Sequence, residues 1–459
     1  MRRAVVALII LPVSATVAAR RRPVPPPIED VVASLLGSAL VSTEAWSELT
    51  HLCDNIGHRL TGSAALETAV DWGIDEMAAD GLTAWKQEVP VRIWTRGEES
   101  LTMLAPMSRD LGLLGLGWSI GTDGPLEAEV VVADSFEHLT SLGDAVAGKI
   151  VLFDVPFTGY GETVRYRGGG ASAAAKQGAV GVLVRSIAPH GLYTPHTGAM
   201  GYAEDVTKIP AAAITLEDAA WIRRLSASGQ TVRVRLDMGA LDAGEGISHN
   251  AIGEIEGRAL PDEVVVLGCH IDSWDVGQGA QDDGGGCAAA MEAGRLIAEL
   301  PVAPRRSVRV VLFTNEENGL AGAKTYAEGV QKRHVAAIES DTGMGAPGGF
   351  RLDIRGGDED KDEALVAEKI AAFTAVMAPV SEMLRPIGAD GMRPAYSGAD
   401  IGPLVVGGAI GLGVDHDTTG YWPIHHTPAD TLDKIDPDNL RRTAAAMAVM
   451  AYALAELDY

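Results

Sequence analysis

The sequence predicts an α/β protein in which a mixed, mostly parallel sheet is sandwiched by helices, with a second, β-rich domain inserted into it. Apolar runs typical of buried strands alternate with helical stretches over the second half of the chain, as expected for a parallel sheet. A separate series of short strands occupies residues 111–238. With 459 residues, of which 47% are hydrophobic and 22% charged, the chain has ample material for two hydrophobic cores.

The N-terminal segment is typical of an export signal. Two arginines precede an apolar run from Ala4 to Val13, and small residues follow at 17–19. This order predicts a signal peptide over residues 1–19 and a secreted or periplasmic protein. An uncleaved membrane anchor is the weaker alternative, because the run is shorter than the roughly 20 residues that a spanning helix needs.

Charge and cysteine content exclude several classes. The chain has 37 Lys and Arg against 62 Asp and Glu, a net charge of −25, which argues against nucleic acid or an anionic membrane surface as a partner. The apolar segment near the C-terminus contains Glu456, so we expect it to pack on the sheet and predict no stable membrane insertion. Three cysteines are too few for a disulfide framework, and we expect Cys269 to be a small buried hydrophobic residue.

The first half of the chain divides into two patterns. Residues 28–81 have the apolar spacing of two amphipathic helices around a glycine-containing turn, and residues 85–94 alternate as a strand does. The inserted stretch has no cluster of histidines and acids, so we treat it as a separate domain. Its expected strands are 149–155, 179–184, 209–215 and 231–238, and its expected helices are 172–177 and 216–227. The predicted domains are 20–110 with 239–459, which together form the main domain, and 111–238, the insertion.

In the second half, metal-binding or acid–base side chains follow each predicted strand. The strands are 264–268, 308–313, 335–340 and 408–414, and the helices between them include 285–300 and 320–331. The side chains after these strands, in order, are His270 with Asp272, Glu316 with Glu317, Asp341, and His425 with His426, while Asp282 and Asp283 begin the helix after the first strand. The carboxyl ends of parallel strands share one edge of a sheet, so we expect these groups to meet there.

Such a cluster requires a cation. No Lys or Arg lies between Gly268 and Met291, and converging carboxylates cannot all ionise in a cleft without a compensating charge. Mixed histidine and carboxylate ligands suit zinc better than calcium. Their number fits two metals about 3.5–4 Å apart that share a carboxylate. Each pair alone is more often structural, and only the recurrence after successive strands favours a metal site.

One glycine-rich stretch resembles a dinucleotide-binding motif, but we do not interpret it as one. Residues 167–173, RGGGASA, contain GxGxxA before a predicted helix. The preceding strand ends about a dozen residues earlier, so the tight strand-to-glycine turn of a dinucleotide site is missing.

The segment HIDSWDVGQGAQDDGGG (270–286) and the order of these side chains resemble the M28 family of co-catalytic zinc exopeptidases. The resemblance covers residues 243–459 and implies the zinc exopeptidase fold, with residues 111–238 as an inserted protease-associated (PA) domain. It also implies two zinc ions per chain. Asp282 would bridge them, and the remaining ligands would be His270 and Asp341 at one ion and Glu317 and His426 at the other. His426 is preferred to His425 by its distance from the pair Asp430–Thr431.

The resemblance implies further roles. Asp272 would orient His270, a common need of metal-bound imidazole. Glu316 would be the general base: it would take a proton from a zinc-bridging water, whose pKa is lowered toward about 7 to give hydroxide, and deliver it to the leaving amine. The peptide bond between Asp282 and Asp283 is often cis in this family.

These expectations together predict an exported di-zinc exopeptidase that hydrolyses dipeptides or removes terminal residues from short peptides. The alternatives are a glutaminyl-cyclase-like acyltransferase with a single zinc and a non-catalytic receptor or binding protein on the same scaffold. The complete ligand set and Glu316 argue against both.

The sequence leaves several points open. It does not decide between amino- and carboxypeptidase specificity, or whether the inserted domain screens substrate size or mediates a homodimer. Residues 396–404 and 413–422 either shape the substrate pocket or form structural loops. The roles of His425, Tyr421, Asp275 and Asp283 are also open.

Overall fold

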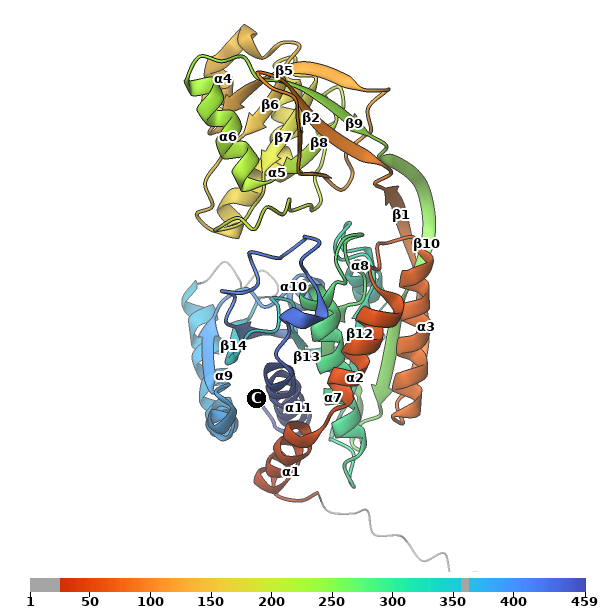
Figure 1. Cartoon of the computed structure of the whole chain (residues 1–459). Helices are drawn as coiled ribbons and strands as arrows, with labels where there is room; N and C mark the ends of the chain where they lie inside the picture. Colours follow the sequence, from red (N-terminus) through yellow and green to blue (C-terminus); the bar gives the residue numbers. More distant parts are fainter. Residues whose placement is uncertain (1–24, 330, 356–362) are drawn as a thin grey trace, which may run out of the picture.

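The computed structural model describes residues 25–329, 331–355 and 363–459, so the predicted signal peptide lies outside the described residues. The chain forms two lobes connected by a long antiparallel ribbon of β1 (Thr83–Thr95) and β10 (Leu241–Ile255) (Figure 1). The lower lobe in Figure 1 contains both ends of the described chain, and the upper lobe is built from the residues between the two ribbon strands. We call them the catalytic lobe and the upper lobe.

The catalytic lobe contains an eight-stranded mixed sheet in the order β1-β10-β12-β11-β13-β16-β14-β15. Its four middle strands, β12, β11, β13 and β16, are parallel to one another, which confirms the predicted fold class and all four predicted strands. The strands other than β1 and β10 are β11 (Leu260–His270), β12 (Arg306–Phe313), β13 (Arg333–Glu339), β14 (Pro347–Asp353), β15 (Gly391–Pro394) and β16 (Ile410–His416).

Side chains of β11 alternate between two cores, because successive residues of a strand point to opposite faces. Val265 and Leu267 belong to the larger core, which includes residues of α7 and α11, whereas Val264 and Val266 pack in a smaller core with residues of α8 and α10. The helices on the larger-core side are α1 (Ile28–Val41), α2 (Glu44–His51), α3 (Ala64–Ala79), α7 (Gly285–Ala298), α9 (Glu363–Met383) and α11 (Pro437–Glu456), and those on the other side are α8 (Ala321–Glu328) and α10 (Gly402–Val406). Short helical turns complete the lobe: η1 (Leu52–Ile56), η3 (Ala280–Gly284), η5 (Arg385–Ile387) and η6 (Leu432–Lys434).

Two helical expectations had different outcomes. The C-terminal helix α11 is buried along most of its length and packs against α7 and the sheet, as predicted. The N-terminal stretch forms three helices rather than two, because the chain leaves the helical conformation at Ser42, whose backbone is extended. Among the described residues, one helix, α9, is long and apolar enough to cross a membrane by length and composition; core helices can also meet that test.

The upper lobe has its own eight-stranded sheet, in the order β3-β2-β9-β5-β6-β7-β8-β4. The strands are β2 (Glu99–Ala105), β3 (Arg109–Leu111), β4 (Leu113–Gly115), β5 (Leu126–Ala133), β6 (Ile150–Phe153), β7 (Gly181–Arg185), β8 (Ala211–Ile214) and β9 (Arg233–Met238), and the helices are α4 (Phe136–Leu142), α5 (Tyr160–Ala175) and α6 (Leu216–Ala227), with the short turn η2 (Gly143–Val146). Helix α5 begins earlier than predicted and contains the glycine-rich stretch 168–170 in its interior.

The upper sheet also includes residues that we had assigned to the main domain. Strand β2 pairs with β9 from Glu99 onward, so this lobe begins before the predicted boundary at residue 111. The reason is that β2 and β9 directly continue the two ribbon strands β1 and β10, and their pairing continues into the upper lobe.

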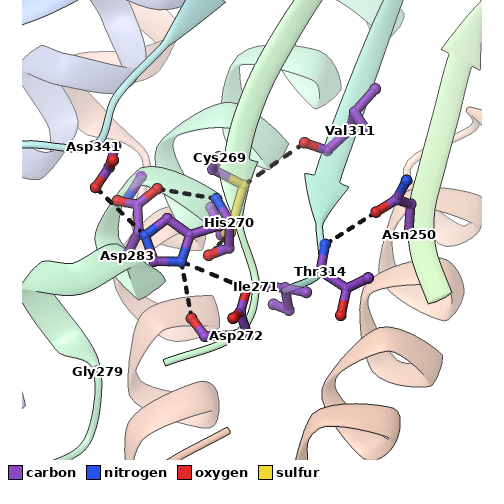
Figure 2. The surroundings of a disulfide bond; sticks show 12 residues. Asn250, Cys269, His270, Ile271, Asp272, Gly279, Asp283, Val311, Thr314 and Asp341 are labelled. Carbon is purple, nitrogen blue, oxygen red and sulfur yellow. Dashed lines mark hydrogen bonds and ion pairs between the residues drawn. A yellow bond between two sulfur atoms is a disulfide. The ribbon is translucent and has the colours of Figure 1, made fainter. Parts of the chain in front are cut away.

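Cys269 is buried near the end of a strand, as expected, but it is not a free thiol. Cys269, at the end of β11, forms a disulfide with Cys287 in the first turn of α7 (Figure 2), and both are buried. The Cα atoms are 5.1 Å apart, within the range that a disulfide needs. Spacing along the chain does not reveal that this strand end and this helix start are adjacent. The bond closes the loop that contains His270 and Asp282.

Candidate active site

The predicted ligands of the first metal lie together at the carboxyl end of the sheet. His270 is the last residue of β11, and Asp341 lies just beyond the end of β13. His270 Nε2 is 3.2 Å from Asp282 Oδ1 and 3.4 Å from Asp341 Oδ1. One ligand atom from each of the three side chains therefore falls within 4.8 Å of the others, a spacing that suits a single metal ion.

A second group faces the other oxygen of Asp282. His426 Nε2 lies 3.2 Å from Asp282 Oδ2 and 3.1 Å from Glu317 Oε2. His425 stacks on His426, and its Nε2 is 3.5 Å from the same Asp282 oxygen. Asp282 thus lies between two groups of ligand-type side chains, with one carboxylate oxygen toward each. The peptide bond between Asp282 and Asp283 is cis, as the resemblance implied.

The donor set fits metal ions. Glu317 Oε1 is buried and accepts no hydrogen bond from any described residue. Asp282 Oδ2 is also buried, and the polar groups that lie near it are the ring nitrogens of His425 and His426. Burial raises the pKa of Glu317, and the neighbouring Asp282 carboxylate also raises it, against the opposing effect of His426. Buried carboxylate oxygens without donors require a cation or a proton. Histidine nitrogens beside carboxylate oxygens are ligands that zinc accepts.

Asp272 connects His270 to the turn that contains Glu316 and Glu317. His270 Nδ1 is 3.0 Å from the backbone oxygen of Asp272 and 3.8 Å from its carboxylate. The carboxylate itself accepts the backbone N–H groups of Glu316, at 3.0 Å, and Glu317, at 3.3 Å. The backbone of Asp272 therefore orients the imidazole, and its side chain fixes the turn that presents the two glutamates.

Glu316 lies beside the ligand groups. It follows β12, and its side chain lines the same cavity as Asp282, Glu317 and Asp341. Burial raises the pKa of Glu316 well above its usual value; His270 opposes the increase, and Asp341 adds to it. A buried carboxyl group beside a predicted metal site has the position of a general base.

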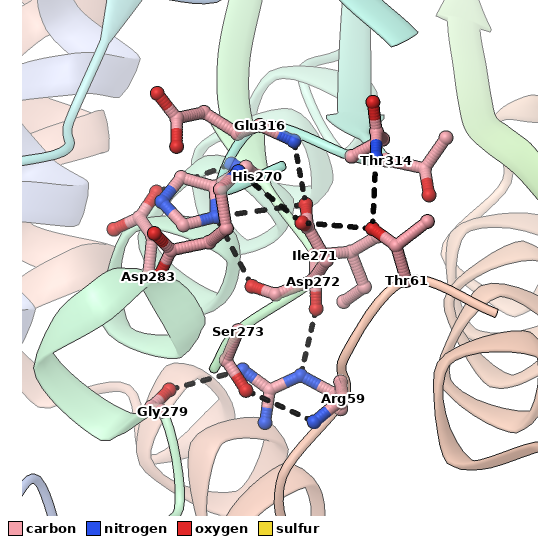
Figure 3. Close-up of polar contacts among 12 residues, drawn as sticks. Arg59, Thr61, His270, Ile271, Asp272, Ser273, Gly279, Asp283, Thr314 and Glu316 are labelled. Atoms are coloured by element: carbon pink, nitrogen blue, oxygen red, sulfur yellow. Dashed lines mark hydrogen bonds and ion pairs between the residues drawn. The ribbon is translucent and has the colours of Figure 1, made fainter. Parts of the chain in front are cut away.

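A fully buried arginine, which the sequence did not single out, supports the site from below (Figure 3). Arg59 Nε donates to Ile271 O at 2.7 Å, and Nη1 and Nη2 donate to Gln278 O at 2.9 Å and Gly279 O at 3.0 Å. Arg59 thus connects the segment after His270 to the segment before Asp282. A single arginine in GHRLTG gives no pattern from which this role could have been read.

Asp283 and Asp275, whose roles the sequence did not decide, hold other parts of the site in position. Asp283 is buried, and its carboxylate accepts the backbone N–H of His270 at 3.3 Å and that of Gly286 at 3.2 Å. Asp275 forms a two-pronged ion pair with Arg96, with distances of 2.6 and 2.9 Å. Arg96 lies where β1 leads into the upper lobe, so this pair connects the loop that contains the ligands to the other lobe.

The upper lobe contacts a predicted metal ligand directly. Thr197 N donates to His426 O at 3.0 Å, and His426 Nδ1 lies 3.3 Å from Thr197 O. His426 has a φ of 60°, a conformation that costs energy for a non-glycine residue. The two contacts with Thr197 stabilise this backbone and turn Nε2 toward the carboxylates.

A cavity of about 410 Å³ opens onto the cluster between the lobes. The two loops 396–404 and 413–422, which the sequence did not assign to the pocket or to the scaffold, both contribute to its wall. The residues are Ala399 from the first loop and Tyr421 and Trp422 from the second. Tyr160 and Arg167 of α5 in the upper lobe complete it. The volume suits a small peptide rather than a folded protein.

The buried acids and histidines at this edge of the sheet open to a cavity of peptide size and define the site of a metallopeptidase. Comparisons with known proteins agree with this class. The profile of peptidase family M28 matches residues 250–451, and that of the PA domain matches residues 124–222.

Individual relatives cover nearly the whole chain. Carboxypeptidase Q of Xenopus laevis is 38% identical over 94% of this chain and 90% of its own length. The crystal structure of a peptidase M28 precursor from Shewanella amazonensis superposes with a TM-score of 0.86 at 34% identity, covering 94% of this chain and 97% of that one. A zinc aminopeptidase from Bacillus subtilis shares the fold, with a TM-score of 0.66 at 20% identity over 90% of this chain and 95% of that one. The chain belongs to peptidase family M28, is similar to carboxypeptidase Q and carries a PA domain, and zinc is the metal that this family implies.

Proposed function

We propose that this protein is an exported exopeptidase with two zinc ions per chain, which hydrolyses dipeptides or removes a terminal residue from short peptides. The observation that carries the proposal is the position of Asp282, whose two oxygens face two separate groups of ligand-type side chains. Similarity to carboxypeptidase Q along 94% of the chain supports exopeptidase activity. Export is proposed from the N-terminal signal pattern.

The proposed ligands are His270 and Asp341 for one zinc, Glu317 and His426 for the other, and Asp282 for both. Glu317 is preferred to His425 because Glu317 Oε2 lies 3.1 Å from His426 Nε2 and its second oxygen has no donor. Burial lowers the pKa of His425 well below its usual value, and the adjacent His426 lowers it further. His425 stacks on the proposed ligand histidine, His426.

Zinc bound at this centre would supply Lewis-acid polarisation of the scissile carbonyl and activation of a water molecule. Glu316, which is not needed as a ligand, accepts a proton from the attacking water and delivers it to the leaving amine. Asp272 holds the backbone of Glu316 in place through its 3.0 Å hydrogen bond. Upper-lobe residues close the cavity and limit the length of peptide that enters it.

The test is to incubate purified, zinc-loaded protein with free dipeptides, their amino-blocked and amidated forms, and longer peptides, and to identify products by mass spectrometry. Metal content is measured in parallel. The proposal expects two zinc ions per chain and cleavage of dipeptides or terminal residues. One zinc ion with cyclisation of N-terminal glutamine would instead indicate a glutaminyl-cyclase-like enzyme, and binding without turnover would indicate a binding protein. Sequencing the N-terminus of the exported protein tests cleavage after Ala19.

A further inference from the structure

Arg96 lies at the junction of the two lobes, and its side chain is buried, with 9% of its surface exposed. It directly follows β1, the ribbon strand that leads from the catalytic lobe into the upper lobe. Nε donates to Asp275 Oδ2 at 2.9 Å, and Nη2 donates to Asp275 Oδ1 at 2.6 Å. Asp275 belongs to the loop between His270 and Asp282. The guanidinium is therefore attached to the segment that contains two of the predicted metal ligands.

The same guanidinium also holds the upper-lobe residue that contacts His426. Arg96 Nη2 donates to Thr197 Oγ1 at 3.3 Å. Arg96 Nη1 donates to Gly115 O, which also accepts the Thr197 hydroxyl at 2.7 Å. Thr197 is fully buried, and its backbone N–H and carbonyl both face His426. One arginine thus connects the loop of Asp275 to the backbone that holds His426.

His426 depends on the upper lobe for its hydrogen bonds outside the acidic cluster. In the part of the chain that the structure describes, the other partners of its backbone and ring are Thr197 and Arg167, both from the upper lobe. An Nδ1–H that donates to Thr197 O leaves the lone pair of Nε2 directed at Asp282 and Glu317. The direction of the imidazole therefore follows the position of Thr197.

The ligand segment 270–282, by contrast, has supports of its own within the catalytic lobe. Arg59 donates to backbone oxygens near both of its ends, and the disulfide closes the loop that contains it. We expect this segment to keep its place when Arg96 is replaced. Asp275 is then a fixed anchor, and Arg96 transmits its position to the upper lobe and to His426.

We propose that Arg96 is a positioning residue for the zinc ion of Glu317 and His426. The proposal rests on the two-zinc function above and adds that the lobe junction sets the affinity of one of the two zinc sites. Loss of the guanidinium frees Thr197 and, with it, the backbone of His426, whose φ of 60° is unfavourable without support. Groups that orient a metal-bound imidazole change metal affinity by about 10–100-fold.

The test measures stepwise zinc binding to the metal-free full chain by calorimetry, with zinc content checked by atomic emission. The binding step that His426→Ala abolishes identifies the site in question. Arg96→Met is expected to weaken that step by about 10–100-fold and to leave the other step unchanged. Arg96→Lys keeps the charge and should restore part of the affinity. Arg92→Met is the matched control, because Arg92 is an exposed arginine of β1 paired with Asp242, and it should bind zinc as wild type does.

Two further substitutions test the route from Asp275 to His426. Asp275→Asn keeps the shape of the side chain and should weaken the same step, and the double variant with Arg96→Met should be no weaker than Arg96→Met alone. Thr197→Val removes the hydroxyl at nearly constant volume and should weaken that step by a smaller factor. Urea unfolding in EDTA shows whether each variant is folded. If Arg96→Met is not folded, the Asp275 and Thr197 variants decide.

The outcomes that would overturn the proposal are distinct. Equal weakening of both steps would make Arg96 a general support of the fold. An unchanged binding profile in folded Arg96→Met would remove its role while leaving the two-zinc function intact. Additive effects of the Arg96 and Asp275 substitutions would refute the route through Asp275. If the wild type binds a single zinc ion, the two-zinc function itself fails, and the role of Arg96 fails with it.

Discussion

Replacing Arg59 with methionine is expected to lower the free energy of unfolding of the metal-free protein by about 2–4 kcal/mol and to weaken metal binding. Methionine fills much of the same space but donates nothing. The substitution removes the donors to four backbone oxygens, those of Gly57, Ile271, Gln278 and Gly279, at 2.7–3.0 Å. Arg59 itself is fully buried, and its hydrogen bonds to Ile271 and Gly279 are buried as well, so these two oxygens have little access to replacement water.

The magnitude follows from two opposing effects. Hydrogen bonds to a charged group contribute about 1.5 kcal/mol or more each, which for four bonds gives a loss of about 6 kcal/mol. Removing a buried charge returns several kcal/mol of desolvation energy, and burial already lowers the pKa of Arg59. The difference is the net loss of about 2–4 kcal/mol. Metal affinity falls because Arg59 connects the segments that carry His270 and Asp282.

The assay is urea unfolding followed by circular dichroism, with EDTA to remove the contribution of bound metal, and a separate zinc titration. Arg385→Met is the control, since Arg385 is an exposed arginine paired with Glu382 and Asp390, and such surface pairs contribute little to stability. An Arg59→Met protein with an unchanged urea midpoint and unchanged zinc affinity would refute the reasoning.

The other predictions concern the site and its pH dependence. Glu316→Gln is expected to bind zinc as wild type does while kcat falls by at least about 100-fold, in the range for loss of a general base; substantial turnover by the zinc-loaded variant would contradict that role. His426→Ala should bind one zinc ion fewer per chain, measured by atomic emission, and His425→Ala should keep both ions. The reverse result would show that His425 is the zinc ligand and His426 is not. Burial lowers the pKa of His334 from 6.5 to about 4, so the unfolded chain takes up a proton at His334 before the folded protein does, and stability should fall as pH decreases from about 6.5 to about 4. His334→Gln should reduce that slope in denaturant titrations at several pH values, and an unchanged slope would show that His334 does not cause it.

The strands and the residues at their ends could be predicted from the sequence because both follow local patterns. Runs such as 264–268 are apolar at every position, since both faces of a central parallel strand are buried. Polar residues that interrupt the chain directly after such a run must lie at the carboxyl end of the sheet. The grouping of His270, Asp282 and Asp341 needed only this rule and a parallel sheet.

Other features depended on contacts between distant segments, and no local pattern indicates them. Arg59 is an ordinary arginine in the sequence, and Cys269 pairs with Cys287 because a strand end and a helix start adjoin in space. The boundary at residue 111 was placed where the pattern changes, whereas the ribbon strands continue directly into β2 and β9.

By itself, the sequence determined which segments become the parallel strands and which side chains follow them, and a metal site was predicted from these, because burial and charge act on each short segment separately. The tertiary structure decided which supporting groups hold those residues and how the upper lobe meets them. The contacts of Thr197 and Arg167 with His426 join residues more than 200 positions apart. Such contacts depend on how two separately folded lobes are oriented by their connecting ribbon, and that orientation is a property of the assembled chain.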